Sequence, residues 1–236
     1  MKTPYIEKML EQLKQLPLSV INEWAGRDIG NLSEFDNNEI HGSLRVYETD
    51  LAEKTAIGSI SVNNKVNFGF CTIIPRSYYA VPIYVSRWEE VQDTIKFFVD
   101  LLPTVDMIVD ETYRVKFLES MGESWERFLN LPGITPEDDN DLRSATSIIY
   151  TAACVPIEND GMRLAALAPH LDYLKKYIPL IKTEKPVNDA AKLKEIARRI
   201  TAVRTVFNAN LQNSISKIAE PKLGKETIDQ FCTALT

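Results

Sequence analysis

The chain has 236 residues, of which 44% are apolar and 25% are charged, so it has enough hydrophobic material for one large domain over residues 1–236. Its formal net charge of −6 argues against a general nucleic-acid-binding protein, whose phosphate contacts need clustered cations.

The first forty residues are predicted to be helical at the start and irregular afterwards. Apolar residues from Tyr5 to Leu13 recur at helical spacing, which predicts an amphipathic helix over residues 4–15. A second, short helix is expected over residues 19–24, and the polar residues 30–38 are typical of a loop.

The middle of the chain is predicted to form a sheet, because short apolar runs are separated by turn residues. Short strands that follow one another through turns favour an antiparallel meander over crossover connections. The Asn63-Asn64 pair is typical of a tight turn. The expected strands cover residues 40–49, 56–62, 66–74, 81–85 and 96–101.

From Glu111 onwards the hydrophobic period is mostly that of helices, so we expect an α/β chain of the α+β type. Residues 147–155 are β-branched and apolar, which indicates a strand or a buried segment. The acidic residues 137–141 indicate a solvated loop or a helix start. The helices expected here cover residues from 111 to Pro132, then 164–181, 189–211 and 227–235, with a hinge at 182–188.

The cysteines and histidines are too few and too scattered for several kinds of site. No C-x-x-C pair occurs, so neither a disulfide framework nor a zinc site is expected, and the chain is predicted to be cytoplasmic. Only two histidines are present, which argues against a multi-histidine metal centre. No apolar run approaches the roughly 20 residues of a membrane span.

Three segments resemble the red chlorophyll catabolite reductases. Residues 98–106 (FVDLLPTVD) are similar to the segment that follows the central strands of that family, and residues 144–156 (SATSIIYTAACVP) are similar to its next strand. His170-Leu-Asp172 resembles its late catalytic segment. The resemblance contains no long identical block, and it depends on the order and spacing of the pieces.

The related ferredoxin-dependent bilin reductases show a pattern of proline-bounded strands that this chain resembles. The matching segments are residues 70–75, 81–84 and 99–103. The resemblance implies a central antiparallel sheet sandwiched between helical layers, with a linear tetrapyrrole held between the sheet and the C-terminal helices. It also implies that no metal or flavin is bound, that reduced ferredoxin supplies the electrons, and that acidic or histidine side chains supply the protons.

The chain departs from these families at the positions of their proton donors. Phe70 aligns with a histidine of the bilin reductases, and Arg87 lies near an aspartate. Thr72 or Ile73 lies near a glutamate of the chlorophyll catabolite reductases. Only the late aspartate is retained, as Asp172. The departures indicate an altered substrate, a different proton path, or a member that binds without reducing.

Three residues are candidate proton donors. Asp172 is the first, because a carboxyl group in an apolar pocket has a raised pKa and donates a proton near neutral pH. The alternative is that it caps a helix that begins near Pro169. His170 is the second candidate, because histidine titrates near physiological pH, and the alternative is a partly exposed loop histidine without a catalytic role. His41, on the first strand, is a candidate to replace the missing histidine.

Four residues are candidates for binding the substrate. Arg87 is suited to a propionate, because guanidinium pairs bidentately with carboxylate, although a solvated surface position explains it equally well. Tyr84 belongs to a group of aromatic residues that suits either a planar ligand or the core. Phe70 and Thr72 take strand positions that line the family's site.

Lys194, Arg198 and Arg199 belong to the most basic stretch of this acidic chain. Opposite charge speeds the encounter with an acidic electron carrier, so these residues are candidates for ferredoxin docking. The alternative is an ordinary solvated helix face, since Glu195 interrupts the run.

The predicted function is ferredoxin-dependent reduction of a linear tetrapyrrole, either a bilin or a chlorophyll catabolite. The alternatives are a binding or chaperone protein on the same fold, and a domain acting on an unrelated small molecule or a protein partner. Phosphate-binding and serine-hydrolase motifs are missing from the sequence, which argues against nucleotide-dependent enzymes and serine hydrolases.

Overall fold

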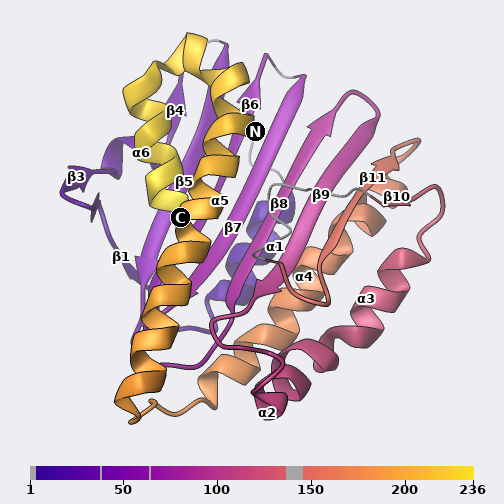
Figure 1. Cartoon of the computed structure of the whole chain (residues 1–236). Helices are drawn as coiled ribbons and strands as arrows, with labels where there is room; N and C mark the ends of the chain where they lie inside the picture. Colours follow the sequence, from indigo (N-terminus) through magenta and orange to yellow (C-terminus); the bar gives the residue numbers. More distant parts are fainter. Residues whose placement is uncertain (1–3, 38, 64, 137–145) are drawn as a thin grey trace.

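The computed structural model describes residues 4–37, 39–63, 65–136 and 146–236. A nine-stranded sheet lies at its centre (Figure 1). Its long strands are β5 (Ile40–Glu48), β6 (Ala52–Val62), β7 (Val66–Pro75), β8 (Ile83–Val91) and β9 (Thr94–Leu102). Its short strands are β1 (Ser19–Val20), β4 (Phe35–Asp36), β10 (Thr135–Pro136) and β11 (Thr151–Pro156). A separate two-stranded sheet pairs β2 (Glu23–Trp24) with β3 (Arg27–Asp28).

The main sheet runs in the order β1-β5-β6-β7-β8-β9-β11-β10, with β4 also paired to β5, and every pair is antiparallel. Strands β5 to β9 pair with their neighbours in sequence, so the predicted meander is confirmed. The order follows from short turns between strands, since such turns leave no room for a crossover.

Helices cover both faces of this sheet (Figure 1). Helices α1 (Pro4–Leu13) and α4 (Asp160–Lys182) lie on one face, together with the shorter α2 (Glu111–Tyr113), the π-helical η2 (Arg114–Leu118), η3 (Glu119–Met121) and α3 (Gly122–Leu129). Helices α5 (Ala190–Leu223) and α6 (Lys225–Leu235) lie on the other, and a single 3-10 turn, η1 (Gly30–Leu32), precedes β4. The predicted α+β fold, with a sheet between helical layers, is confirmed.

The alternation of side chains along the strands decides what each helical layer packs against. On β7, Phe68 and Phe70 join a buried cluster with the end of α5 and with α6. Cys71 and Ile73 point the other way and join the cluster that includes α1 and α4. Both faces of this strand are buried, so it has a nearly continuous apolar sequence in place of a strict alternation.

The predicted helix over residues 19–24 is wrong. These residues form β1 and β2 instead, because Ser19 pairs with Glu48 and Val20 with Tyr47 on the edge of the main sheet. Pairing with a distant strand outweighs local propensity here. Part of the predicted loop 30–38 forms η1 and β4, while Asn38, Asn64 and the acidic residues 137–141 lie outside the described residues.

The late helices are longer than the sequence pattern predicts. Helix α4 begins at Asp160, where the side chain of Asn159 accepts a hydrogen bond from the backbone N–H of Met162 at 3.0 Å. Pro169 therefore lies inside the helix and does not begin it. The strand predicted at residues 81–85 also extends, as β8, to Val91.

A glycine allows β7 and β8 to lie close together. Gly69 is directly opposite Trp88 in the register of the two strands. A methyl group at Gly69 would lie 1.9 Å from the indole ring of Trp88, which is itself 2% exposed. The ring therefore occupies the space that a side chain at position 69 would need.

Candidate functional site

A cavity of about 230 Å³ lies between the sheet and α5. Two rows of residues that are directly opposite one another on neighbouring strands form its floor. Phe70, Arg87, Phe98 and Ala152 form the first row, and Phe68, Glu89 and Lys96 form the second. The roof is the inner face of α5, contributed by Leu211, Ser214 and Ile215.

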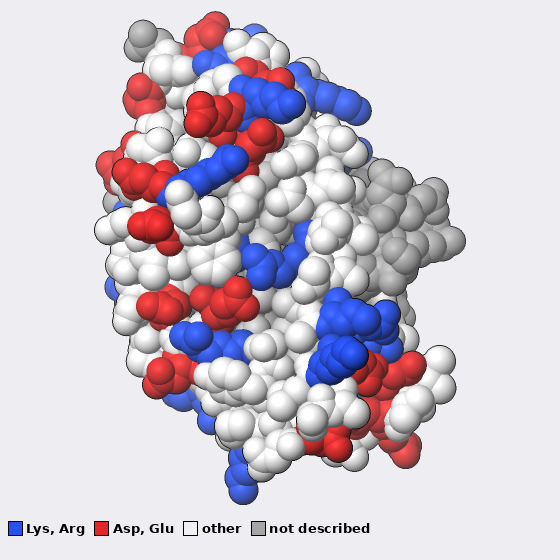
Figure 2. All heavy atoms as spheres, turned by 60° about the vertical axis from the view of Figure 1, so that its left-hand side comes forward, with Lys and Arg blue, Asp and Glu red and all other residues white. Residues whose placement is uncertain are grey.

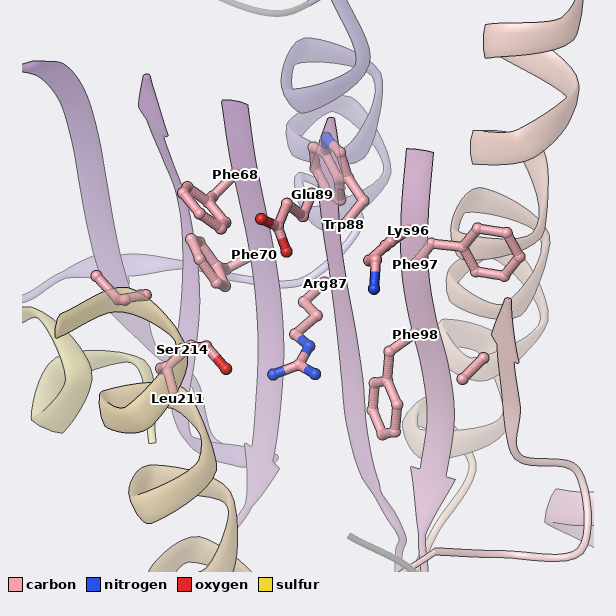
Figure 3. Close-up of a pocket in the computed structure, with 12 residues that line it drawn as sticks. Phe68, Phe70, Arg87, Trp88, Glu89, Lys96, Phe97, Phe98, Leu211 and Ser214 are labelled. Atoms are coloured by element: carbon pink, nitrogen blue, oxygen red, sulfur yellow. The ribbon is translucent and has the colours of Figure 1, made fainter. Parts of the chain in front are cut away.

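Aromatic rings form the walls of the cavity. Phe68 and Phe70 are stacked on one side, with their ring centroids 6.2 Å apart and their planes 14° apart. The ring of Phe98 lies on the other side, as Figure 3 shows. Flat rings on both sides of a cavity suit a flat, conjugated ligand, although aromatic residues on a sheet also serve as core.

The floor of the cavity carries two cations and one carboxylate. Arg87 and Glu89 point to the same side of β8, because they are two residues apart, and Lys96 is directly opposite Glu89 on β9. Figure 3 shows all three side chains on the cavity side of the strands. The formal charge of this set is +1, which favours an anionic ligand.

Arg87 links the floor of the cavity to its roof. Its Nη1 donates a hydrogen bond to Oδ1 of Asn210, on α5, at 2.5 Å. Its guanidinium carbon also lies 5.9 Å from the centroid of the Phe98 ring. Of the two alternatives for Arg87, a fully solvated surface position does not fit the structure, because the side chain is half-buried between the sheet and a helix.

A second, much smaller cavity of about 10 Å³ lies further along the same face of the sheet. Thr72 lines it, and the Thr72 hydroxyl donates a hydrogen bond to the backbone oxygen of Leu235 at 2.6 Å. Phe98 and Phe207 lie next to each other between the two cavities, with ring centroids 6.1 Å apart. The end of α6 and the Phe207 side chain thus separate Thr72 from the larger cavity.

His170 and Tyr84 lie on the opposite face of the sheet. The Tyr84 hydroxyl donates a hydrogen bond to the backbone oxygen of His170 at 2.8 Å, and Nδ1 of His170 lies 2.7 Å from the Ser86 hydroxyl. Both side chains are fully buried. The Tyr84 ring lies 5.8 Å from that of Tyr177, so its surroundings are those of a core residue.

Burial keeps the imidazole of His170 neutral. The rings of Tyr5, Trp88 and Phe97 surround it at centroid distances of 5.6 to 6.0 Å, and its Nε2 has no hydrogen-bond partner among the described residues. Loss of water around the ring lowers the pKa of His170 to about 3. The loop position expected for His170 is therefore wrong, since the residue lies inside α4.

Asp172 and His41 also lie on this opposite face. The Asp172 side chain is 33% exposed, and its Oδ2 lies 3.5 Å from Nη2 of Arg127. It is in the interior of α4, so the interpretation of Asp172 as a helix cap is wrong. Alternation along β5 places His41 on the face away from α5, half-buried and directly opposite Ser61.

The cavity therefore brings together only part of the set predicted from the sequence. Phe70 and Arg87 line it, and Thr72 lies on the same face beyond Phe207. Tyr84, His170, Asp172 and His41 lie on the other face of the sheet. Sequence reasoning missed two charged residues that line the cavity, Glu89 and Lys96, and it missed Asn210, which accepts a hydrogen bond from Arg87.

Two of the missed residues could have been predicted from the alternation of side chains along β8 and β9. Glu89 is two residues from Arg87, and Lys96 is two residues from Phe98, so each pair shares one face. No comparable signal marks Asn210, because its partner lies on a strand more than a hundred residues away.

The surface around the molecule carries both signs of charge. Figure 2 shows one face, on which basic, acidic and neutral side chains are interspersed and Lys or Arg side chains lie in a hollow near the middle. On α5, Lys194 and Arg198 are exposed, whereas Arg199 pairs with Asp106 at 3.5 Å and with Glu195 at 3.0 Å.

Two kinds of feature are missing from the described residues. No helix in these residues is long and apolar enough to cross a bilayer. In the same residues, no three His, Cys, Asp or Glu side chains gather as a set of metal ligands.

Solved structures with the same arrangement of sheet and helices are known. Tomato phytochromobilin synthase, in complex with biliverdin, matches with a TM-score of 0.72 at 14% identity, over 97% of this chain and 80% of that one. The chain has the fold of phytochromobilin synthase. PcyX matches with a TM-score of 0.53 at 13% identity, over 97% of this chain and 93% of its own. No family model and no curated protein matches the sequence.

Proposed function

We propose that the cavity between the sheet and α5 binds part of a linear tetrapyrrole, and that the protein reduces this pigment with electrons from a ferredoxin-type carrier. The observation that carries the proposal is the Arg87 guanidinium among aromatic walls, in a fold shared with a protein solved in complex with biliverdin. A linear tetrapyrrole is flat, conjugated and carries carboxylates, so it suits both features.

The size of the cavity limits how the pigment binds. Sites for drug-sized molecules have volumes of about 300–1,000 Å³, whereas this cavity measures about 230 Å³. One end of an extended pigment fits within it, and the remainder lies along the opening beside α5. A ligand that needs the full length of the sheet face would require α5 to move away from Phe98.

Arg87 is the proposed partner of a propionate group. Guanidinium binds carboxylate through two parallel hydrogen bonds, and such charge-assisted bonds are roughly twice as strong as neutral ones. Phe68, Phe70 and Phe98 would contact the pyrrole rings from the two sides.

Glu89 is the proposed proton donor, in place of Asp172. Saturating one double bond of the pigment takes two electrons and two protons, so a reductase needs an acid beside the ligand. Glu89 is the carboxylic acid that lines the cavity, whereas Asp172 lies on the other face of the sheet. The electrons come singly from the carrier, which is oxidised, and each transfer is balanced by a proton that enters through Glu89.

Titration with biliverdin tests the binding step. We expect the purified protein to shift the visible absorption spectrum of the pigment, because aromatic contacts and a fixed conformation change its conjugation. Arg87→Gln should weaken this binding about tenfold or more, through the loss of a charge-assisted contact. An unchanged spectrum at high protein concentration would contradict the proposal.

Single-turnover reduction tests the chemical step. We expect photoreduced ferredoxin to consume the bound pigment in the wild type, and Glu89→Gln to bind the pigment normally while accumulating a one-electron-reduced radical. The radical is detected by electron paramagnetic resonance.

The second candidate function is a tetrapyrrole-binding protein that does not reduce its ligand. Two residues favour this function. Phe70 and Arg87 align with proton donors of the bilin reductases, but neither side chain carries a transferable proton near neutral pH. The same experiment separates the two functions. A shifted spectrum without turnover would support binding alone.

A further inference from the structure

Asn210 is a polar residue on the inner face of α5. It is 8% exposed, and its neighbours on the inner face of the helix, Phe207 and Leu211, are buried among apolar side chains. A buried amide is destabilising unless its hydrogen bonds are made, so a residue of this kind needs a partner. Its partner is Arg87.

The contact between these residues fixes where the guanidinium lies. Nη1 of Arg87 donates to Oδ1 of Asn210 at 2.5 Å, and the guanidinium carbon lies 5.9 Å from the centroid of Phe98. The long, flexible side chain of Arg87 is thereby held at its end by Asn210 on α5 and on one side by the ring of Phe98. Figure 3 shows the guanidinium at the centre of the cavity, between Ser214 and Phe98.

We infer that Asn210 is a positioning residue, which holds the Arg87 guanidinium ready for a carboxylate of the ligand. The inference rests on the proposed function, because it assumes that a carboxylate-bearing pigment enters the cavity. An amide is suited to this role because it is neutral: it accepts an N–H without cancelling the positive charge. Holding Arg87 in advance removes the cost of ordering its side chain when the ligand binds.

Two substitutions separate the hydrogen-bond acceptor of Asn210 from its neutral charge. Asn210→Leu keeps a side chain of similar size on the apolar face of α5 but removes the acceptor, so Arg87 loses its fixed orientation. Asn210→Asp keeps the acceptor but adds a negative charge, so Arg87 stays oriented while its charge is compensated. Both variants should bind a carboxylate less well, and the aspartate variant should show the larger loss.

The readout is the preference for a free carboxylate over an ester. Biliverdin and biliverdin dimethyl ester share one ring system, and the ratio of their dissociation constants therefore reports on the carboxylate contact. We expect the wild type to bind biliverdin at least tenfold more tightly than the ester. Asn210→Leu should reduce this ratio about threefold or more, and Asn210→Asp should bring it close to one.

A double-mutant cycle tests whether Asn210 acts through Arg87. In an Arg87→Gln background, Asn210→Leu should leave the ratio unchanged, because no guanidinium remains to be positioned. Asn213→Leu is the matched control, since Asn213 is exposed three residues later on the same helix. Near-ultraviolet circular dichroism of each variant shows whether it is folded.

The outcomes are distinguishable. A wild-type ratio that survives in both Asn210 variants overturns the inference and leaves the proposed function standing. A fall in the ratio that is equally large in the Arg87→Gln background also overturns it, because Asn210 would then act independently of Arg87. A wild type that binds neither pigment overturns the proposed function and this inference with it.

Discussion

At the scale of single residues, burial shifts two titratable side chains outside the cavity, His170 and Asp100, away from their charged forms. His170 has its pKa lowered to about 3, so it stays neutral in the folded protein. Asp100 is fully buried in β9, and burial raises its pKa to about 6 against the hydrogen bonds that it accepts from Ser147 and from the backbone N–H of Leu101. The folded protein thus favours the neutral form of each group.

We expect His170 to make the protein less stable in mild acid. The unfolded chain takes up a proton at its histidine near pH 6.5, whereas the folded chain does so only near pH 3. The contribution of His170 to stability is therefore complete above pH 6.5 and falls by about 2 kcal/mol between pH 6.5 and 5. Urea unfolding of the wild type at several pH values measures this loss.

The double variant His170→Leu with Ser86→Ala isolates the effect, because it replaces both hydrogen-bonding partners by apolar groups. Its free energy of unfolding should fall less steeply between pH 7 and 5 than that of the wild type. His41→Gln is the matched control, because it removes the other histidine of the chain, which is half-buried on β5. A double variant with the wild-type slope would show that His170 is not the source.

We expect Ser147 to matter most when Asp100 is ionised. The hydroxyl and the backbone N–H of Ser147 both donate to the Asp100 carboxylate. Ser147→Ala removes a bond to a charged group, so the free energy of unfolding should fall by about 1.5–3 kcal/mol at pH 7.5 and by less at pH 5, where Asp100 is protonated. Denaturant unfolding of the variant at the two pH values measures this difference, and equal losses would contradict the assignment.

At the scale of elements, the packing of Trp88 between β7 and β8 depends on the absence of a side chain at Gly69. Gly69→Ala would place a methyl group against the Trp88 ring, and overpacking of this kind typically costs about 1–3 kcal/mol. We expect thermal or chemical denaturation to show this fall in the free energy of unfolding, accompanied by a change in tryptophan fluorescence.

A glycine elsewhere in the chain provides the comparison. Gly122, at the start of α3, has no atom within 4 Å of the position that a methyl group would take. Gly122→Ala should therefore leave stability unchanged or raise it by about 0.4–1 kcal/mol. If both alanine variants had the same stability, close approach of the indole would not be the reason for Gly69.

The elements that the sequence predicted well are those whose pattern is local. Strands β5 to β7 and β9, and helix α1, follow from hydrophobic spacing and turn residues, and their boundaries lie within a few residues of those predicted. The helix predicted at residues 19–24 failed because β1 forms only against Tyr47 and Glu48, a partner that no local pattern reveals.

The site was less predictable than the fold for a related reason. The sequence identified Arg87 and Phe70 through resemblance, but it could not show which face of the sheet each candidate occupies. Asp172 is two residues from a buried histidine on α4, with the whole sheet between this helix and the cavity. The positions of the roof residues and of Asn210, the partner of Arg87, depend on how α5 docks, which is a tertiary property.

At the scale of the whole molecule, the basic stretch of α5 is the proposed docking surface for an acidic electron carrier. Lys194 and Arg198 are exposed and four residues apart, so they lie on one stripe of the helix. Changing both to Glu should slow reduction by ferredoxin about threefold to tenfold at low salt, with a smaller effect at high salt, since surface attraction is screened.

Stopped-flow reduction at several ionic strengths measures this effect. The matched control changes Lys8 and Lys14 to Glu, because these exposed lysines belong to the N-terminal part of the chain, and α1 covers the opposite face of the sheet. The two charge reversals alter the net charge equally. Equal slowing by both pairs would indicate a general charge effect and would contradict docking at α5.

The floor and the roof of the cavity come from distant parts of the chain, and this has a consequence for biosynthesis. Strands β7 to β9 are complete by residue 102, but the roof residues Leu211, Ser214 and Ile215 leave the ribosome more than a hundred residues later. During that interval Phe68, Phe70 and Phe98 face water or a chaperone. Slowing translation in the second half of the message should therefore increase aggregation of the nascent chain, and the cavity is complete only after synthesis has passed α5.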